Sequence, residues 1–420
     1  MSQRQRRVVI SGLGVISPIG LNKNTFWDNL LQGKSGIGNI ESFDCSAFPT
    51  RIAAEIKDFS ASDYVPRKDA RRMDRFVQFA CAASQMAVED AGLKPILNRV
   101  GERTVERTGV IIGSGVGGIA TFEEQHKNLL DKGAGAISPF FIPMMIPNMA
   151  SGQVAIMLRV TGPNSCTVTA CASATHAIGD AFRTIKHNQA DIMLAGGSEA
   201  AITPMAIGGF CAMKALSTQN QEPLKACRPF DLNREGFVMG EGAGVLVLEE
   251  MEHALERGVT PYAELIGFGC SADAVHMVQP DVEGKGAAAA FRMAINDAGI
   301  SPSAVDYINA HGTGTRLNDQ METTAIKEVF GNHSYQMAIS STKAATGHML
   351  GAAGAVELIA AVLSLVEQII PPTLNLEVSD PLCDLDYVPL KSRQKNLRIA
   401  ASDSLGFGGH NAALVVEKMR

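Results

Sequence analysis

Three side chains that lie far apart in this sequence could together carry out nucleophilic chemistry. Cys171 follows a β-branched segment and precedes an amphipathic helical pattern, which predicts that it lies at a strand-to-helix turn. Unpaired backbone N–H groups and the positive end of a helix dipole favour a thiolate there. His311 and His348 are each predicted to lie in a turn after a strand. A cysteine with a distant histidine is a recurring catalytic pair, and neutral imidazoles can donate hydrogen bonds to a developing oxyanion.

Each of these residues also has a structural explanation. Most free cysteines are buried and inert, and an isolated histidine is more often a hydrogen-bonded structural residue. Lys343, five residues before His348, is either a solvated lysine or a buried charge that tunes the site, and Glu357 could then pair with it. The glycine-rich turn around Phe407 could direct backbone N–H groups at an anion, or it could be an ordinary hairpin turn with a core phenylalanine.

Nucleotide and metal motifs are weak or absent. The segment GSGVGG at 113–118 formally matches a dinucleotide-binding pattern, but no strand ending in Asp or Glu follows about 20 residues later, as ribose recognition requires. We therefore interpret the segment as a tight turn. The P-loop pattern is missing, and the eight cysteines include no C-x-x-C pair. The sequence predicts no cofactor and no metal.

The composition favours a compact protein of ordinary globular type. Its 420 residues are 46% hydrophobic and 19% charged, and the net charge of −6 disfavours nucleic acid and anionic membranes as partners. No window approaches the roughly 20 uninterrupted apolar residues of a membrane span, and the first apolar run is predicted to be a strand rather than a secretory signal. The scattered cysteines are expected to be free thiols, which favours a cytoplasmic location.

Strands and helices are predicted to alternate, which indicates an α/β fold with buried sheets. Strands are expected at 8–14, 110–118, 192–199, 245–250 and 264–269, and helices at 75–92, 284–299 and 351–368. The helix segment QMAVEDAGL (85–93) is echoed by RMAINDAGI (292–300). The echo indicates an internal duplication with a seam near 250–262, although it could be a coincidence between two amphipathic helices. We therefore expect two halves, 1–255 with Cys171 and 256–420 with both histidines.

Four ordered motifs make the chain recognisable. They are TACASA around Cys171, NAHGTGT around His311, STKAATGHMLGAAGA around Lys343 and His348, and GFGGHN around Phe407. Together they resemble the β-ketoacyl-acyl-carrier-protein synthases, most closely the elongating type II enzyme, over essentially the whole chain. The resemblance implies an α/β, thiolase-like, five-layered αβαβα fold of two duplicated halves, a homodimer, and decarboxylative Claisen condensation of an acyl-enzyme thioester with malonyl-acyl-carrier-protein.

The resemblance also implies catalytic roles. Cys171 matches the acyl-accepting nucleophile, and His311 and His348 match the pair that promotes decarboxylation and stabilises the enolate. Lys343 matches the lysine hydrogen-bonded beside them. Phe407 resembles the gating phenylalanine, and its N–H is expected to form the oxyanion hole with that of Cys171.

Five further positions match the family's substrate-binding set. Thr313 and Thr315 resemble the hydroxyls that hold the phosphopantetheine arm. Val116 and Phe210 fall where the family lines its acyl pocket, and Glu357 matches an acidic residue of the network around the lysine.

The partner implied is acyl carrier protein, loaded with acyl or malonyl groups. The basic run PRKDARRMDR matches the family's carrier-docking region, and at helical spacing one face carries Lys68, Arg71, Arg72 and Arg75. Lys214 is expected to extend this surface. An isolated charge run of this kind is otherwise usually a solvated helix face.

The chain departs from the family pattern at several positions. The usual Asn-Ser-Phe before Gly-Phe-Gly-Gly begins here with Asp403 and ends with Leu405, and Val278 replaces a hydroxyl residue near the gate. Gly135 and Ala136 stand where a basic pair is common. These departures bear on gating and carrier docking.

Three other functions are alternatives to this one. A polyketide ketosynthase shares the chemistry and differs only in its acyl substrate. A non-catalytic chain-length partner subunit would lack the cysteine that this chain keeps. A thiolase would need a second cysteine near the C-terminus, which the terminal glycine motif does not contain.

Overall fold

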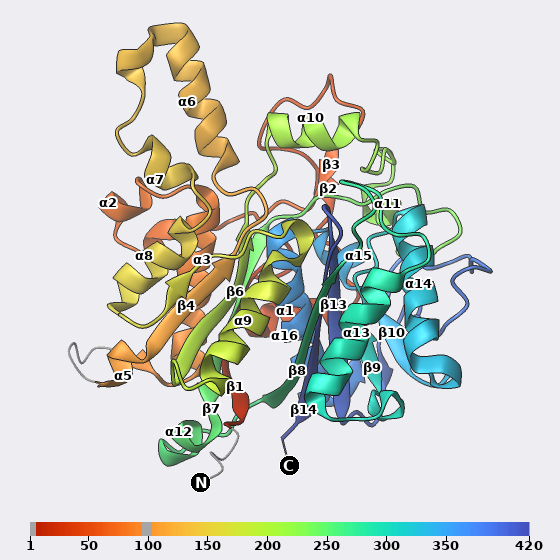
Figure 1. Ribbon diagram of the computed structural model, residues 1–420. Helices are drawn as coiled ribbons and strands as arrows, with labels where there is room; N and C mark the ends of the chain where they lie inside the picture. The colour runs from red at the N-terminus through yellow and green to blue at the C-terminus, as the bar shows by residue number, and fades with distance from the viewer. Residues whose placement is uncertain (1–5, 95–102, 420) are drawn as a thin grey trace.

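The computed structural model describes residues 6–94 and 103–419, and in these ranges a single large sheet organises the chain (Figure 1). Its ten strands run in the order β10-β9-β13-β14-β8-β1-β7-β6-β4-β5. They are β1 (Val8–Ile16), β4 (Thr108–Gly113), β5 (Asn164–Ser165), β6 (Ile192–Glu199), β7 (Gly242–Glu250), β8 (Ala263–Ala272), β9 (Tyr307–Asn309), β10 (Ala338–Ser340), β13 (Ile399–Gly406) and β14 (His410–Lys418). Two small ladders pair β2 (Gly38–Asn39) with β3 (Ile52–Ala53), and β11 (Ile369–Ile370) with β12 (Arg393–Gln394).

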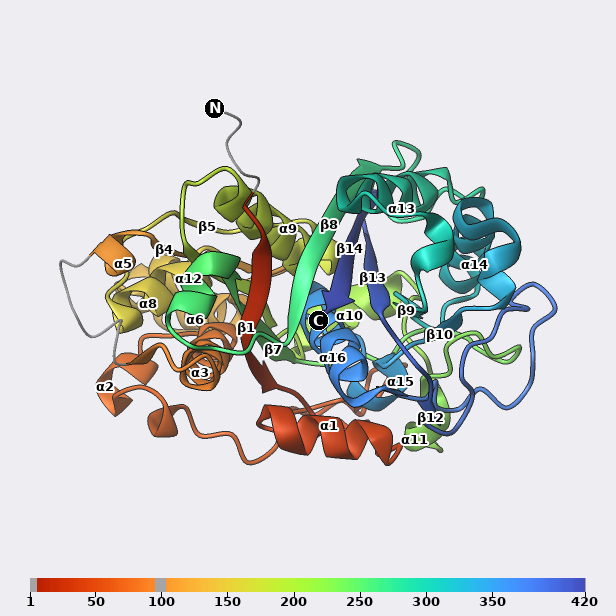
Figure 2. The ribbon, with the colours of Figure 1, turned by 90° about the horizontal axis from the view of Figure 1, so that it is seen from below.

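The strand order is the same in the two halves of this sheet. Each half has five strands, which can be numbered first to fifth in the order in which they occur along the chain. Across the sheet, both halves then have the order third, second, fourth, fifth, first, which is β5-β4-β6-β7-β1 in one half and β10-β9-β13-β14-β8 in the other. The halves join where Val8–Ile10 of β1 pairs antiparallel with Ala263–Leu265 of β8. Figure 2 shows β1 and β8 side by side at this junction, with α3 on one side of it and α13 on the other.

Helices complete five layers. The helices are α1 (Lys23–Leu31), α2 (Arg67–Ala70), α3 (Arg75–Asp90), α5 (Arg103–Glu106), α6 (Ile119–Lys132), α7 (Phe141–Met145), α8 (Met149–Leu158), α9 (Ser173–Lys186), α10 (Pro204–Ala212), α11 (Pro223–Ala226), α12 (Met251–Glu256), α13 (Lys285–Ala298), α14 (Arg316–Phe330), α15 (Lys343–Thr346) and α16 (Ala353–Glu367). Helix α3 packs on β1 and β7, and α13 packs on β8 and β14, whereas α9 and α16 contact strands of both halves. This arrangement confirms the predicted αβαβα layering.

The predicted echo corresponds to equivalent packing in the two halves. In α3 the Asp90 carboxylate accepts a hydrogen bond from the Leu13 N–H (2.9 Å), and in α13 Asp297 accepts one from the Phe268 N–H (3.1 Å). Each helix lies so close to its strand that a Cβ on Gly12 or on Gly267 would overlap helix atoms. The repeated AVEDAG and AINDAG segments are therefore the same structural element.

One expectation about membranes needs a correction. The 18-residue segment Leu350–Glu367 is long and apolar enough, by composition, to cross a bilayer, although no such window was expected. It is 89% buried in the fold, because α16 lies in the central layer between the two sheet halves. Its apolar composition is that of a core helix, which must be hydrophobic on all sides.

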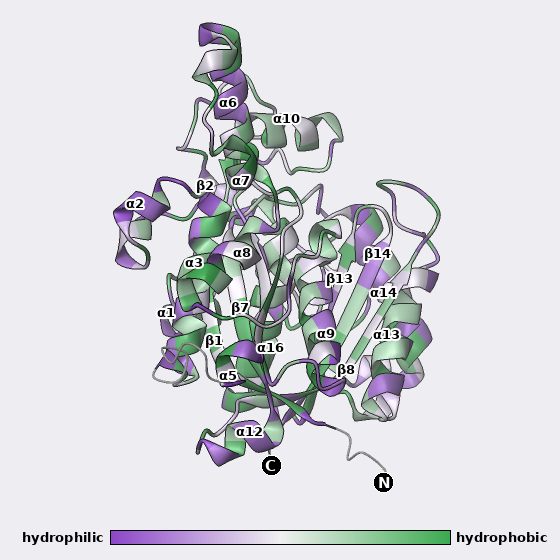
Figure 3. Cartoon of the chain, turned by 60° about the vertical axis from the view of Figure 1, so that its left-hand side comes forward, coloured by the Kyte–Doolittle hydropathy of each residue, from purple (hydrophilic) through white to green (hydrophobic). Residues whose placement is uncertain are grey.

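The basic run before α3 is also not one continuous helix. Helix α2 ends at Ala70, and Asp74 caps the start of α3 by accepting a hydrogen bond from the Phe76 N–H. Lys68 and Arg75 therefore lie on different helices, and Arg75 pairs with Glu241. Figure 3 shows α2 as a hydrophilic segment beside the hydrophobic strands and helices of the first half.

Candidate active site

The predicted nucleophile lies at the entrance of the central helix α9. Cys171 occupies the short turn Ala170–Ala172, and α9 begins at the next residue, Ser173. The turn is held by hydrogen bonds from Ser173 Oγ to the Ala170 carbonyl (2.7 Å) and from the Thr169 N–H to Ser173 Oγ (2.9 Å). Gly406 of β13 faces this turn so closely that a Cβ would collide with the Thr169 carbonyl. The position of the cysteine thus depends on a glycine from the other half.

His311 lies in the turn after β9, as predicted. The carboxylate of Glu322 in α14 accepts hydrogen bonds from the backbone N–H groups of His311 (2.7 Å) and Gly312 (2.8 Å). Sequence reasoning missed Glu322. A signal was present, because Asp319 and Glu322 are three residues apart in the helix after the NAHGTGT turn and so share the face that meets it.

His348 reaches the site from a different local structure than expected. The short helix α15 separates it from β10, so the residue does not directly follow a strand. Its backbone is fixed by hydrogen bonds from its own N–H to the Val238 carbonyl (2.7 Å) and from the Gly240 N–H to its carbonyl (2.9 Å). The imidazole packs edge to face against Phe237, with 5.2 Å between ring centroids.

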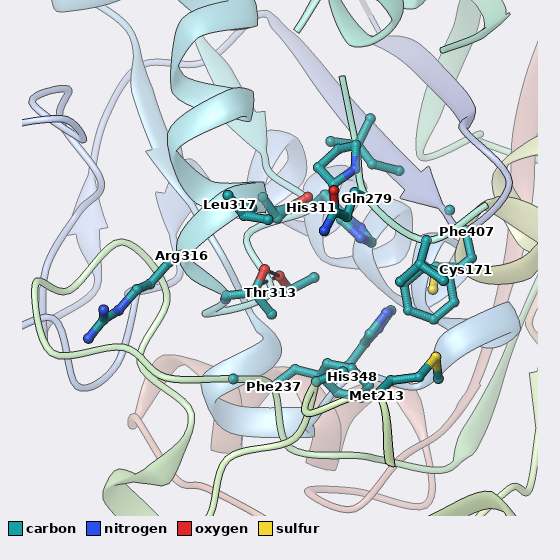
Figure 4. Close-up of a pocket in the computed structure, with 18 of the residues that line it drawn as sticks. Cys171, Met213, Phe237, Gln279, His311, Thr313, Arg316, Leu317, His348 and Phe407 are labelled. Atoms are coloured by element: carbon teal, nitrogen blue, oxygen red, sulfur yellow. Dashed lines mark hydrogen bonds between the residues drawn. The ribbon is translucent and has the colours of Figure 1, made fainter. Parts of the chain in front are cut away.

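The cysteine and both histidines line one cavity of about 370 Å³. The His311 and His348 rings lie 5.3 Å apart between centroids and nearly perpendicular. Figure 4 shows them facing the same space as Cys171 and Phe407. The structure thus brings Cys171 and Phe407 together, although 236 positions separate them in the sequence. The cavity is also lined by Phe210, Met213, Lys214, Phe237, Thr313, Thr315 and Phe407.

A buried ammonium group determines the tautomer of His311. Lys343 is fully buried and forms an ion pair with Glu357. Its Nζ also donates to the His311 carbonyl and lies 3.4 Å from His311 Nδ1. Because an ammonium can only donate, Nδ1 must accept, and the ring proton of a neutral His311 is on Nε2. The imidazole therefore presents an N–H donor on the side away from Lys343.

Both histidines are neutral at pH 7. Burial lowers the pKa of His311 and of His348 well below the usual value, and the positive charge of Lys343 lowers both further. Two neutral imidazoles in a buried cavity suit the stabilisation of a developing negative charge, because they donate hydrogen bonds without carrying a charge of their own.

The expected resting thiolate is not supported. Burial raises the pKa of the Cys171 thiol to about 12, although Lys343 and the backbone N–H groups of Phe407 and of Cys171 itself act in the opposite direction. Desolvation of the sulfur outweighs the helix terminus, so the free thiol is protonated at neutral pH. The same two N–H groups converge on the sulfur, which is where the oxyanion hole was predicted.

Three of the five predicted substrate-binding residues line the cavity and two do not. The Phe210 ring is tilted against that of Phe407, with 6.1 Å between centroids, and the hydroxyls of Thr313 and Thr315 are 3.0 Å apart in the cavity wall. Val116 is exposed outside the cavity lining. Glu357 is also outside the lining, because its carboxylate pairs with Lys343 beneath the site. It supports the lysine and does not contact the cavity.

The predicted docking residues divide into two groups. Lys214 is exposed and lines the mouth of the cavity. Lys68, Arg71 and Arg72 are exposed but lie outside the lining, and the Arg72 guanidinium stacks over Phe140 at 4.5 Å. Of the predicted docking residues, Lys214 thus lies at the cavity mouth, whereas Lys68, Arg71 and Arg72 lie outside the cavity lining.

Comparisons with known proteins agree with this geometry. The descriptions "Beta-ketoacyl synthase, N-terminal domain" and "Beta-ketoacyl synthase, C-terminal domain" match residues 5–254 and 262–377. Similar proteins include the 3-oxoacyl-[acyl-carrier-protein] synthase 2 of Synechocystis, 51% identical over 99% of this chain and 98% of its own. The protein of the same name from Staphylococcus aureus is 50% identical over 100% and 99%.

Solved structures of ketosynthases have the same fold. The chain matches the ishigamide ketosynthase/chain length factor with a TM-score of 0.92 and 35% identity, covering 99% of this chain and 100% of that one. A beta-ketoacyl synthase from Burkholderia phymatum gives a TM-score of 0.90 and 34% identity with the same coverage. A type II polyketide ketosynthase solved in complex with its acyl-carrier protein gives 0.89 and 36%, again over 99% and 100%. This chain belongs to the β-ketoacyl synthase family.

Proposed function

We propose that the chain is a 3-oxoacyl-acyl-carrier-protein synthase that extends fatty acyl chains by decarboxylative condensation. The observation that carries the proposal is one cavity in which a cysteine meets two neutral histidines and two converging backbone N–H groups. The full-length relatives named 3-oxoacyl-[acyl-carrier-protein] synthase 2 support it.

The first half-reaction transfers the acyl group to the enzyme. Cys171 Sγ attacks the carbonyl carbon of an acyl-carrier thioester, the N–H groups of Cys171 and Phe407 hold the oxyanion, and the carrier thiol leaves with the cysteine's proton. Because the resting thiol is neutral, it must lose this proton during the attack.

The second half-reaction forms the carbon–carbon bond. The bond between the malonyl C2 and its carboxylate breaks and releases carbon dioxide, and the electron pair becomes an enolate whose oxygen accepts hydrogen bonds from His311 and His348. The C2 carbon then attacks the acyl-enzyme carbonyl, the carbon–sulfur bond breaks, and the Cys171 sulfur takes up a proton from solvent water. Decarboxylation supplies the carbanion without a strong base, so stabilising the enolate charge is the main catalytic task.

A polyketide ketosynthase is the second candidate, and a specific observation favours it. Two of the matching structures are a ketosynthase/chain length factor and a type II polyketide ketosynthase. Their identity to this chain is 35–36%, whereas the 3-oxoacyl-carrier synthases reach 50–51%. The retained Cys171 disfavours the non-catalytic chain-length subunit.

The proposal includes a homodimer. Strand β5 forms one end of the ten-stranded sheet, and its two residues are exposed. Close to it, on the packed helix α8 and on the following loop, Ile156 is 67% exposed and Val168 is 54% exposed. An open sheet edge flanked by exposed apolar side chains is typical of an interface, and a second copy could continue the sheet.

We also place the enzyme in the cytoplasm. All eight cysteines are free thiols in the structure, as expected in a reducing compartment.

The identity of the nucleophile can be tested with a series of acyl carriers of different chain length. Wild-type protein should form 3-oxoacyl products with fatty acyl carriers, and Cys171→Ala should form none because the acyl acceptor is gone. Cys166→Ala, the matched control, should keep this activity. Mass spectrometry of products and of intact protein gives both results, and an acyl adduct that persists in Cys171→Ala would contradict the assignment. Activity confined to polyketide intermediates would favour the second candidate.

Loss of either histidine should slow decarboxylation without preventing acyl transfer. His311→Ala and His348→Ala should still accept an acyl group on Cys171, but each should lose malonyl decarboxylation by about 10²-fold or more, as expected for loss of an oxyanion donor. Release of labelled carbon dioxide measures this step. The exposed His187, at the far end of α9, provides a His187→Ala control. Normal release from either cavity variant would remove that histidine from the mechanism.

Carrier docking should depend on charge. Lys68→Glu/Arg71→Glu should raise the Michaelis constant for carrier-bound substrate and leave turnover of a small pantetheine thioester unchanged, because exposed charges mainly affect encounter. Arg72 is left intact because it packs on Phe140. Lys34→Glu/Lys391→Glu makes the same charge change at exposed sites elsewhere. An equal loss with both substrates would indicate that the run is structural.

The dimer interface can be tested at the sheet edge. Ile156→Lys should shift the mass measured by sedimentation from twice the chain mass of 44.5 kDa toward a single chain, because a buried lysine without a partner is unfavourable at an interface. Leu382→Lys changes a side chain of similar exposure, 61%, in the other half and should leave the mass unchanged. A monomeric wild type would refute the homodimer.

A further inference from the structure

The carboxylate of Glu199 is buried at the end of β6, beside the turn that joins β4 to α6. Glu199 is 0% exposed, and it has no part in the proposed mechanism. Its Oε1 accepts hydrogen bonds from the Ser114 hydroxyl (2.9 Å) and from the Val116 N–H (3.2 Å). Its Oε2 accepts hydrogen bonds from the Gly115 N–H (2.7 Å) and from the Gly351 N–H (3.0 Å). One carboxylate therefore binds groups from both halves of the chain.

These contacts require an ionised carboxylate. Three of the four partners are backbone N–H groups, which can only donate. Ser114 Oγ accepts a hydrogen bond from the Gly117 N–H (3.1 Å), so its own hydrogen can point at Glu199. Burial raises the pKa of Glu199, and the four hydrogen bonds act in the opposite direction. Because each oxygen already accepts two hydrogen bonds, a proton on either one would displace a donor.

The GSGVGG turn at 113–118 holds an anion that belongs to the chain itself. Successive backbone N–H groups in a turn can form a concave anion-binding site, which in nucleotide-binding proteins holds phosphate. Here the N–H groups of Gly115 and Val116 donate to Glu199. This explains why the turn matches a dinucleotide-binding pattern although its N–H groups are occupied.

Glu199 connects this turn with the segment after His348. Gly351 is three residues beyond His348, in the turn that precedes α16. Its backbone lies against Gly115, because a Cβ on Gly351 would be only 2.3 Å from the Gly115 nitrogen. The two backbones can approach so closely because both N–H groups donate to the same carboxylate oxygen.

The GSGVGG turn also supports the residue before the nucleophile. A Cβ on Gly115 would be 3.4 Å from the carbonyl oxygen of Ala170, which precedes Cys171. Ala170 has a φ of 51°, and Leu350, at the equivalent position before α16, has a φ of 44°. Residues other than glycine are strained in this region and persist there only where neighbouring groups hold them. Glu199 thus lies between two strained turns that lead to the reacting groups.

We propose that Glu199 is a positioning residue that fixes the nucleophile turn of Cys171 relative to the segment of His348. The negative charge holds the backbones of Gly115 and Gly351 together, because a neutral amide would place a donor opposite one of their N–H groups. Without the charge, the two turns would move apart. The inference rests on the proposed function, in which the acyl group on Cys171 reacts with an enolate that His348 helps to stabilise.

Glu199→Gln tests the charge at nearly constant size. Condensation turnover should fall about tenfold or more, because a small displacement of reacting groups has a large effect on rate. The KM for malonyl-carrier should change little, because the predicted carrier-docking residues are on other segments. Glu249→Gln is the matched control, since Glu249 is also 0% exposed and accepts hydrogen bonds from Arg257, but it lies at the opposite end of the β6–β7 ladder. Unchanged turnover in Glu199→Gln, or an equal loss in Glu249→Gln, would overturn the proposal.

A second variant tests the anion directly. Glu199→Ala removes a CH₂–COO⁻ group, which has the size and charge of acetate. Acetate should raise the melting temperature of Glu199→Ala and restore part of its turnover, because acetate can accept the same four hydrogen bonds. Acetamide has the same shape without the charge and should do neither.

Three results of this experiment would refute the role of the charge. They are no effect of acetate on Glu199→Ala, an equal effect of acetamide, and an equal effect of acetate on wild type. Failure of the proposed function would be distinguishable from these results. It would appear as a wild type that does not condense acyl groups, while acetate still stabilises Glu199→Ala and acetamide does not.

Discussion

The close approach of α9 and α16 at their N-terminal ends is the constraint on which the site depends. Gly354 at the start of α16 faces Thr175 of α9 and Ser404 of β13, and a Cβ there would overlap the Thr175 hydroxyl. Gly351, in the turn before α16, faces the backbone of Gly115 just as closely. Larger residues at these contacts would separate the halves. Because the proposed nucleophile Cys171 lies at the entrance of α9 and His348 precedes α16, this separation sets the geometry of the cavity.

The duplication explains why the site is composite. Equivalent turns precede the equivalent helices α9 and α16, at Ala170–Ala172 and Leu350–Ala352, and both point into the same central layer. Only the first turn carries a cysteine. The second half supplies His311 from the turn after β9 and His348 from the segment after α15. Each half thus contributes a different chemical function to one cavity, and neither half has all of the reacting groups.

Electrostatics in the cavity follow from one buried cation and the carboxylates around it. Burial, with a further contribution from the charge of Lys343, lowers the pKa of both histidines and keeps them neutral, and the hydrogen bonds of Lys343 fix the His311 tautomer. Its charge requires a buried partner, and Glu357 fills that role. The carboxylate of Glu322 is stabilised without a second cation, because it accepts the backbone N–H groups of His311 and Gly312. The net effect is a polar layer beneath a cavity whose reacting groups carry no charge at rest.

The sequence by itself determined several of the strands and helices, and its motifs predicted the reacting residues. Short β-branched runs that end in glycine predicted β1, β4, β6, β7 and β8, and helical periodicity predicted α3, α13 and α16, because these patterns are local consequences of backbone geometry. The motifs around Cys171, His311, Lys343, His348 and Phe407 identified the family, since they are read directly from neighbouring residues. The echo of AVEDAG and AINDAG predicted the duplication for the same reason.

The tertiary structure decided what depends on long-range contact. Glu322 has no motif of its own, and its role arises from two N–H groups that a turn in another segment presents to it. Helical spacing predicted that Lys68 and Arg75 share one helix face. In the structure α3 begins after its N-cap Asp74, so the two residues lie on different helices. The helix terminus predicted a thiolate at Cys171, whereas burial by residues distant in sequence raises its pKa. Desolvation and hydrogen-bond partners are properties of the packed chain, and local sequence does not specify them.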